Sequence, residues 1–287
     1  MSNKNYQSIL WLLVIISPAI SIMGVMPSAI AFAGLVSAIG TFSRCVFAFI
    51  HGSQHLGWRN IFVMFCITCV VSWCYESLSI ATGFPFGHYV YTSHLGLKLG
   101  TVPLEIMPAY FGVCYLAWVL SHVLLDRFSQ KIDSKLLFAI PIVAAFVMAM
   151  WDMTMDPHSA TVEHAWIWRD GGGYFGVPFS NFLGWYLCVF TIFQLWAIYL
   201  KHAKQGGDSS LDDLKSSWYL PVLFYASISL EALAAASFTN DGTVVDAASQ
   251  VWSLKALYQT LGLVSIFTMV FVSCLAFIKV RINAKLR

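Results

Sequence analysis

The sequence predicts an all-α polytopic membrane protein, a bundle of about eight transmembrane helices with two aromatic, glycine-rich outer loops. Of its 287 residues, 59% are hydrophobic and only 10% are charged, and the mean hydropathy is +0.72. A soluble domain carries about 25% charged residues. Backbone groups cannot remain unpaired in lipid, so the spans must be helices or a closed barrel. The apolar runs are long and uninterrupted, which favours helices over the short alternating strands of a barrel.

Each predicted helix is an apolar run of about twenty residues, the length that crosses the hydrocarbon core. The first two are separated by a tight turn at Met26-Pro27-Ser28, and the N-terminal run, without a small-residue cleavage site, is interpreted as a retained span. Short connections and the lack of an internal repeat predict one integral membrane domain over residues 1–287. The predicted spans are residues 8–26, 28–50, 59–82, 104–125, 135–156, 181–201, 217–238 and 256–279.

The basic residues predict the orientation of the bundle. Twelve of the sixteen lysines and arginines fall on the side that holds both termini, and Arg44 lies within the second span. Only Lys98, Arg169 and Lys255 fall on the other side. Cytoplasmic loops carry an excess of Lys and Arg, so we expect cytoplasmic termini and a location in the bacterial inner membrane. The twelve are Lys4, Arg59, Arg127, Lys131, Lys135, Lys201, Lys204, Lys215, Lys279, Arg281, Lys285 and Arg287.

Two carboxylates, Asp152 and Asp156, close the apolar run of residues 136–150. A spacing of four places both on one helix face, where they can share a proton or a ligand. An ionisable residue at the end of a lipid-spanning helix costs several kcal/mol unless it faces a polar interior, which indicates a functional pair. A structural alternative remains for Asp156, since an aspartate before Pro157 is also a common way to end a helix.

Glu76 and Glu231 lie in the outer halves of other predicted spans, at a depth similar to that of the aspartates. No basic residue stands among these four carboxylates in the sequence, and like charges crowded in a low-dielectric site cannot all ionise. We therefore expect at least one to be protonated near neutral pH, and a protonated carboxyl group in an apolar cavity is a proton donor.

The two longest connections, residues 83–103 and 157–180, are on the same outer side. Glycine and proline prevent them from continuing a helix, and they are too aromatic for flexible linkers. We expect them to fold back onto the bundle as a lid or re-entrant segment. The alternative is an aromatic belt at the membrane interface, although a belt needs neither histidines nor buried acids.

Three uses of the carboxylates compete. A metal site is disfavoured because the outer helices lack a paired His and carboxylate spacing, while His51 and His55, four apart, lie on the other side. A proton-coupled transporter would show inverted halves, which are not visible. Acid chemistry on a lipid-soluble substrate needs a desolvated acid and aromatic faces that stabilise a carbocation. The outer region supplies such faces in Trp73, Tyr75, Tyr89, Tyr91, Trp151, Trp166, Trp168, Tyr174 and Trp185.

Three ordered blocks resemble the carotenoid biosynthesis membrane proteins, a family that includes CruF-type carotenoid 1,2-hydratases and bisanhydrobacterioruberin hydratase. The blocks are ESLSIATGFPFGHYVYT at residues 76–92, WDMTMDP at residues 151–157 and GGYFGVPFSNFLGW at residues 172–185. The resemblance covers roughly residues 70–200. It implies addition of water across the terminal 1,2 double bond of an acyclic carotenoid end group, which gives a tertiary alcohol without a redox cofactor. We expect no cofactor and name no metal ligand. The implied partners are a polyene or isoprenoid substrate, membrane lipids and other carotenoid enzymes, while the net charge of +2 gives no sign of a nucleic-acid partner.

The matching blocks contain Glu76, His88, Asp152, Asp156 and Asn181. We hypothesise that one aspartate of the pair protonates the double bond while the other is charged, and that Glu76 with His88 orients and deprotonates the attacking water. Tyr91 and Asn181 would place polar groups at the cavity mouth. The candidate substrate-binding residues are Tyr91, Asn181, Trp151, Tyr174, Trp185 and Glu231.

Two other functions remain open at this point. A proton-initiated terpenoid or carotenoid cyclase or isomerase would quench the same cation internally, so its product would keep the mass of the substrate. A non-catalytic isoprenoid-binding or transport protein would retain binding or flux after Asp152→Asn, because it has no turnover to lose.

Overall fold

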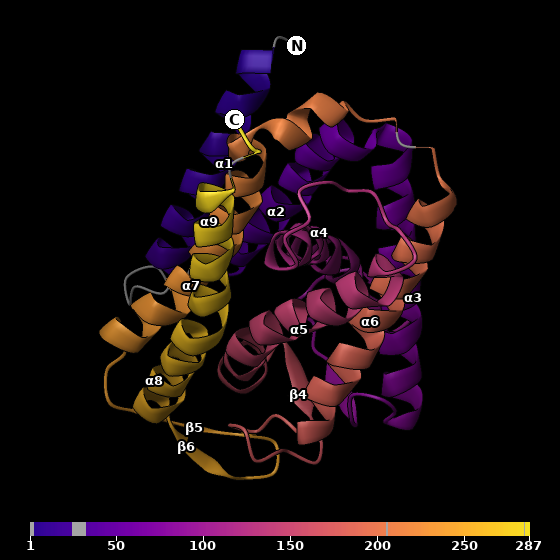
Figure 1. Cartoon of the computed structure of the whole chain (residues 1–287). Coiled ribbons are helices and arrows are strands. Elements are labelled where there is room, and N and C mark those ends of the chain that lie inside the picture. The colour runs from indigo at the N-terminus through magenta and orange to yellow at the C-terminus, as the bar shows by residue number, and fades with distance from the viewer. Residues whose placement is uncertain (1–2, 25–32, 205, 284) are drawn as a thin grey trace.

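The computed structural model describes residues 3–24, 33–204, 206–283 and 285–287, which form a bundle of helices (Figure 1). The long helices are α1 Asn3–Gly24, α2 Ala33–Leu56, α3 Trp58–Thr82, α4 Ile106–Leu124, α5 Leu136–Asp156, α6 Phe179–His202, α7 Lys215–Phe238, α8 Leu254–Ser265 and α9 Phe271–Ile282. Short helical segments are η2 Pro157–Val162, η3 Ser209–Asp213 and η4 Ile266–Val270. The strands are β1 Tyr89–Tyr91, β2 Lys98–Leu99, β3 Val102–Pro103, β4 Trp166–Trp168, β5 Thr243–Val245 and β6 Val251–Ser253.

The predicted all-α polytopic architecture is confirmed. Among the described residues, six helices are long and apolar enough to cross a membrane, and the last of them runs through α8, η4 and α9 as one span of 29 residues. The helices α1 and α2 contain 22 and 24 residues and occupy the first two predicted spans. The turn predicted at Met26-Pro27-Ser28 lies outside the described residues.

Helix α4 is the central helix of the bundle. Every residue from Tyr110 to Val123 is buried, and α4 packs against α2, α3, α5, α7 and α9. The surrounding helices instead expose large apolar side chains, among them Phe62, Phe146 and Phe267. An apolar exterior around a packed interior is what a lipid environment requires of a helix bundle.

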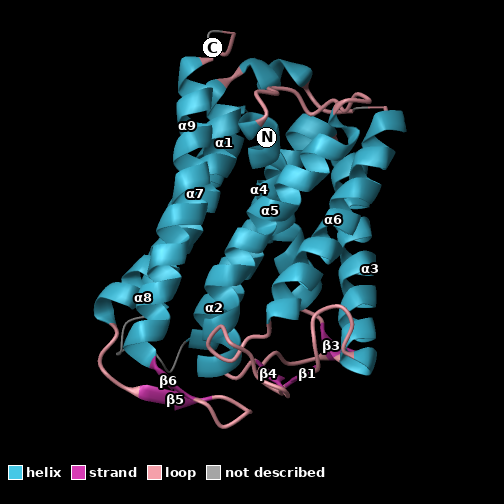
Figure 2. Cartoon of the chain, turned by 60° about the horizontal axis from the view of Figure 1, so that its bottom comes forward, coloured by secondary structure: helices cyan, strands magenta, loops and turns pink. Residues whose placement is uncertain are grey.

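The two ends of the bundle differ in structure. Both labelled termini lie at one end, and the labelled strands gather at the other (Figure 2). There β1 and β4 pair antiparallel, with Tyr89 opposite Trp168 and Tyr91 opposite Trp166. We call this pair the β1–β4 ribbon. It joins the two predicted outer loops, and the carboxylates lie beneath it, as the site geometry below describes.

The triple glycine Gly171–Gly173 lets the second outer loop fold tightly against itself. A Cβ atom on Gly172 would lie 2.1 Å from the backbone carbonyl carbon of Val177, whereas a Cβ on Gly173 would meet nothing within 4 Å. We expect Gly172→Ala to destabilise the protein by about 1–3 kcal/mol, the usual cost of overpacking, and Gly173→Ala to leave stability nearly unchanged. Thermal unfolding of the two neighbouring variants in detergent checks this. Equal melting temperatures would contradict the close approach.

Candidate active site

The acid pair Asp152 and Asp156 lies one helical turn apart at the end of α5, and both side chains are buried, 0% and 1% exposed. Asn181, in the first turn of α6, is also buried and bridges them. Its Nδ2 donates to Oδ2 of Asp152 at 3.1 Å and to Oδ2 of Asp156 at 2.6 Å. One amide therefore holds the two carboxyl groups in a fixed arrangement across the α5–α6 interface.

The two aspartates differ in how many donors they receive. Asp156 accepts two further hydrogen bonds at Oδ1, from the indole Nε1 atoms of Trp166 at 2.7 Å and Trp168 at 3.4 Å. Oδ1 of Asp152 is buried and has no hydrogen-bond partner among the residues that the structure describes. Donors stabilise a carboxylate, so the arrangement favours negative charge on Asp156 and leaves a proton to Asp152.

Glu76, near the end of α3 and 3% exposed, accepts hydrogen bonds from three tyrosine hydroxyls. Tyr89 and Tyr91, the latter at 2.8 Å, donate to its Oε2, and Tyr110 from α4 donates to Oε1 at 2.7 Å. Burial, followed by the negative charge of Glu76, raises the pKa of Tyr89 and of Tyr91 well above the usual range. Both remain protonated donors at neutral pH, and each oxygen of the carboxylate accepts at least one hydrogen bond.

The β1–β4 ribbon connects Glu76 to the acid pair. Because the two ends of β1 face the two ends of β4, the tyrosines bound to Glu76 contact the tryptophans bound to Asp156. The ring centroids are 4.8 Å apart for Tyr89 and Trp168 and 6.0 Å apart for Tyr91 and Trp166. This chain of contacts links Glu76 to the aspartates. Strand β1 donates hydrogen bonds to Glu76, and strand β4 donates hydrogen bonds to Asp156.

Removal of the Tyr110 hydroxyl should lower the stability of the protein, because Glu76 then loses one of its hydrogen-bond donors. Tyr110→Phe keeps the ring stacked on Trp185 at 4.4 Å but leaves a buried carboxylate oxygen without its partner, which costs about 1–3 kcal/mol. The control is Tyr75→Phe, whose hydroxyl is bonded to Thr191 at 2.9 Å in a part-buried position. We expect a clearly lower melting temperature for Tyr110→Phe only. Similar values for both variants would mean that Glu76 does not depend on this donor.

Aromatic rings line the interior beside the acid pair. Trp151 and Trp185 are nearly buried and meet edge to face, with ring centroids 5.8 Å apart. Tyr174 donates from its hydroxyl to the backbone oxygen of Met153 at 3.1 Å, and its ring meets Phe182. The predicted aromatic residues Trp151, Tyr174 and Trp185 thus pack on the same helix ends as the aspartates.

Two predicted site residues lie elsewhere. His88 is exposed, and its Nδ1 is bonded to Oδ2 of the exposed Asp170 at 3.0 Å, so the structure does not bring His88 to Glu76. Positive φ at Gly83 and Gly87 turns the chain so that the His88 ring lies over Gly83 instead.

Glu231 on α7 belongs to a second polar cluster. Arg44 from α2 attracts it electrostatically, which corrects the prediction that no basic residue stands among the four carboxylates. Glu231 also interacts electrostatically with His158 and Tyr258. His158 is bonded through Nδ1 to the Tyr258 hydroxyl at 2.8 Å and pairs through Nε2 with Glu163 at 3.2 Å. The sequence could not show that a cation in the second span lies within electrostatic range of a carboxylate in the seventh.

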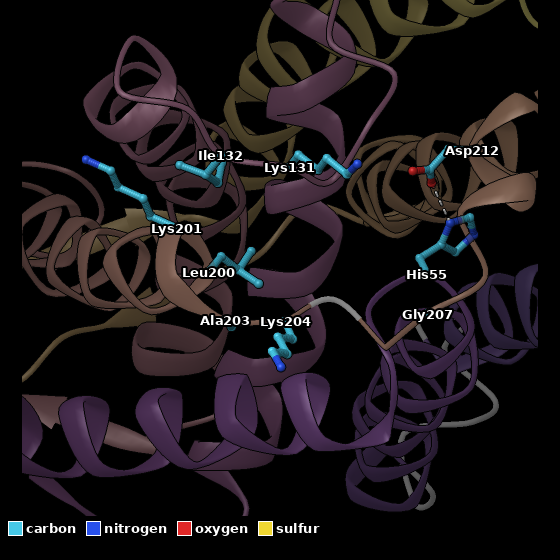
Figure 3. A pocket seen from close by; sticks show the side chains of 9 residues that line it. All are labelled: His55, Lys131, Ile132, Leu200, Lys201, Ala203, Lys204, Gly207 and Asp212. Atoms are coloured by element: carbon cyan, nitrogen blue, oxygen red, sulfur yellow. Dashed lines mark hydrogen bonds and ion pairs between the residues drawn. The ribbon is translucent and has the colours of Figure 1, made fainter.

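A pocket of about 510 Å³ lies at the opposite end of the bundle, far from the acid pair (Figure 3). Its wall includes the pair of His55 and Asp212, with Nδ1 and Oδ1 2.9 Å apart. The lysine ammonium groups of Lys131, Lys201 and Lys204 point in different directions in Figure 3 and do not converge on one point. We therefore take the buried acids, and not this pocket, as the candidate site. In the described part of the chain, no group of three or more His, Cys, Asp or Glu residues is arranged to hold a metal ion.

Comparison with known proteins identifies the family. The model of a family described as "Carotenoid biosynthesis protein" matches residues 32–245, which is most of the chain. The chain belongs to this carotenoid biosynthesis family. It is also similar to a bisanhydrobacterioruberin hydratase from Haloarcula japonica, with 27% identity over 165 residues, 57% of this chain and 54% of the relative. The chain therefore spans about half the length of that relative. No solved structure matches the chain.

Family membership assigns the chain a role in carotenoid biosynthesis, and the apolar helices make it an integral membrane protein. The orientation of its termini and the bacterial inner membrane stay predictions. The matched region includes Glu76, Asp152, Asp156 and Asn181, which the structure collects beneath the ribbon. The sequence alone does not indicate a role for Tyr110. It indicates Trp166 and Trp168 only as members of an aromatic lining. The Tyr-x-Tyr and Trp-x-Trp spacings were the available signal, since alternate residues of a strand share a face.

Proposed function

We propose that this member of the carotenoid biosynthesis family is a hydratase that adds water to the terminal 1,2 double bond of an acyclic carotenoid end group. The observation that carries the proposal is the buried, unpartnered Oδ1 of Asp152 beside a hydrogen-bonded Asp156. A desolvated acid next to its charged partner suits protonation of an unactivated alkene. The hydratase name of the Haloarcula relative and the lipid-embedded fold point in the same direction.

Asp152 is the proposed proton donor. Among the described residues only Asn181 forms a hydrogen bond with its side chain, at Oδ2, which leaves Oδ1 available to carry a proton toward a substrate. In the proposed first step the alkene π pair forms a C–H bond with that proton, and the positive charge develops on the tertiary carbon. Trp151 and Trp185, whose rings lie on the same helix ends, would stabilise that cation by about 0.5–2 kcal/mol each through their π faces.

Asp156 is the proposed base. Three N–H donors hold it as a carboxylate, and its negative charge stabilises the cation through a low-dielectric interior. Water then forms the C–O bond with the tertiary carbon and gives its proton to Asp156. The pair ends with the proton on Asp156, and transfer across one helical turn to Asp152 restores the starting state. The reaction adds one water and needs no redox partner.

Glu76 takes a different role in this proposal from the one that its sequence position suggested. Its oxygens are occupied by three tyrosines and His88 is bonded to Asp170, so Glu76 with His88 is not retained as the water-activating pair. Glu76 acts as a positioning residue that holds the β1–β4 ribbon over the acid pair, and so keeps Trp166 and Trp168 on Asp156.

The test is expression of the chain in a bacterial strain that accumulates lycopene, followed by mass spectrometry of the extracted pigments. The expected result is the gain of one water per converted end group, with oxygen from labelled water in the product. A product of unchanged mass would overturn hydration in favour of the cyclase or isomerase. Unchanged lycopene, together with unchanged bisanhydrobacterioruberin in a parallel strain that makes it, would overturn the proposed reaction for these polyenes.

A further inference from the structure

A second ligand site is indicated at the end of the bundle that holds the termini, where α1, α7 and α9 meet. A groove of about 470 Å³ opens there between the three helices. It is separate from the carboxylates and from the pocket in Figure 3, and the inference does not rest on the proposed hydratase activity. Its lining consists of Trp11, Lys215, Ser216, Tyr219, Leu223, Phe277 and Arg281.

Polar and apolar side chains are separated by depth along this groove. Lys215 is the first residue of α7 and Arg281 lies in the last turn of α9, so both cations stand at the end of the bundle. Leu223 is eight residues farther along α7 and thus lies about 12 Å deeper at 1.5 Å per residue. Phe277 is one turn deeper on α9, and its ring meets that of Tyr219 with centroids 4.8 Å apart.

Both basic residues line the same groove, and none of the described residues that line it carries a carboxylate side chain. Nζ of Lys215 lies 3.3 Å from the backbone oxygen of Arg281, which fixes the ammonium beside α9. The large rings of Trp11 and Phe277 remain 40% and 37% exposed on the groove side of the bundle. Two basic residues at the end of the bundle and an exposed aromatic wall toward its middle match a phosphate headgroup with attached acyl chains.

We propose that this groove binds an anionic phospholipid of the leaflet on the side of the termini, with its phosphate between Lys215 and Arg281 and an acyl chain along Trp11, Leu223 and Phe277. The charge complementarity selects an anionic headgroup over a zwitterionic one, and the apolar wall selects a lipid over a free anion. Each basic residue near a membrane surface strengthens binding of an anionic lipid about five-fold.

The experiment is native mass spectrometry of the delipidated protein in detergent, titrated with phosphatidylglycerol, phosphatidylcholine of the same chains, or inorganic phosphate. The variant is Lys215→Gln with Arg281→Gln. The matched control is Lys201→Gln with Lys204→Gln, which removes the same charge from exposed residues of the same end, in the pocket of Figure 3. We expect one tightly held phosphatidylglycerol, and roughly thirty-fold weaker retention in the groove variant alone.

Three results would overturn the proposal. Equal retention of phosphatidylglycerol and phosphatidylcholine would show that charge does not select the lipid. Equal weakening in the variant and in the control would show that only the net charge of this end matters. Displacement of the lipid by millimolar phosphate would identify a free-anion site. Melting temperatures of both variants, measured without added lipid, distinguish loss of binding from loss of folding, and Phe277→Ala provides a second variant that keeps both charges.

Discussion

Asp152→Asn is expected to reduce hydration by about 100-fold or more while the protein stays folded. The range for a positioned acid is about 10²–10⁴-fold, and asparagine keeps the size of the side chain but offers no acidic proton to an alkene. The hydrogen bond from Asn181 to Oδ2 can be kept by the carbonyl oxygen of the new amide. Since the protonated carboxyl group is already neutral and asparagine has nearly the same shape, we expect a melting temperature close to that of the wild type.

The measurement is the amount of water adduct per unit of protein in the lycopene strain, with the melting temperature of purified protein beside it. Asp241→Asn is the matched control, because Asp241 is exposed and pairs only weakly with Lys255 at 3.4 Å. The control should hydrate like the wild type. Full activity in Asp152→Asn would remove Asp152 as the donor, whereas loss of folding in that variant would show that the carboxyl group is structural.

The helices of this protein could be predicted closely because a membrane imposes a simple rule on sequence. Each span must be a run of apolar residues long enough to cross the core, and the run of residues 59–82 corresponds to α3 within one residue at its start. The break between α5 and α6 was also visible, since Pro178 and the glycines of residues 171–173 cannot continue a helix.

The site could be predicted only where spacing within one helix decides it. Asp152 and Asp156 share a face because α5 is helical, and Asn181 donates a hydrogen bond to each of them. The partners of Glu76 depend on tertiary contacts between three segments far apart in the chain. His88 stands next to Tyr89, yet the two side chains of consecutive strand-like residues point to opposite sides, so one reaches Glu76 and the other reaches solvent.

The ribbon illustrates the same limit. The ribbon forms from two segments of three residues each, whose first residues, Tyr89 and Trp166, are 77 positions apart in the chain. Strands this short offer only the Tyr-x-Tyr and Trp-x-Trp spacings, which do not show that the two segments pair with each other. Their pairing is nevertheless what places tryptophan N–H groups on Asp156, so the asymmetry between the two aspartates is a tertiary property.

The second large effect is expected for Asn181→Leu. Leucine is branched at Cγ like asparagine but has no donor, so both bonds of the bridge are lost, at 3.1 Å to Asp152 and 2.6 Å to Asp156. Asp156 then keeps only its two indole donors, and nothing fixes the two carboxyl groups relative to each other. Loss of a fixed geometry between acid and base commonly reduces turnover about 100-fold. We therefore expect about that fall in the rate of hydration.

A substitution of Asn60, a buried asparagine at the other end of the bundle, distinguishes this loss of activity from a general loss of stability. Asn60 is 2% exposed, donates to the backbone oxygens of Leu56 and Lys204, and accepts from the Tyr199 hydroxyl. Asn60→Leu should lower the melting temperature, since it leaves three buried or part-buried groups without a partner, but the folded fraction should hydrate at the wild-type rate. If Asn181→Leu likewise lost activity only in proportion to folded protein, the bridge would be a structural contact. A fall in the rate per folded molecule for Asn181→Leu alone would show that the amide sets the geometry of the acid pair.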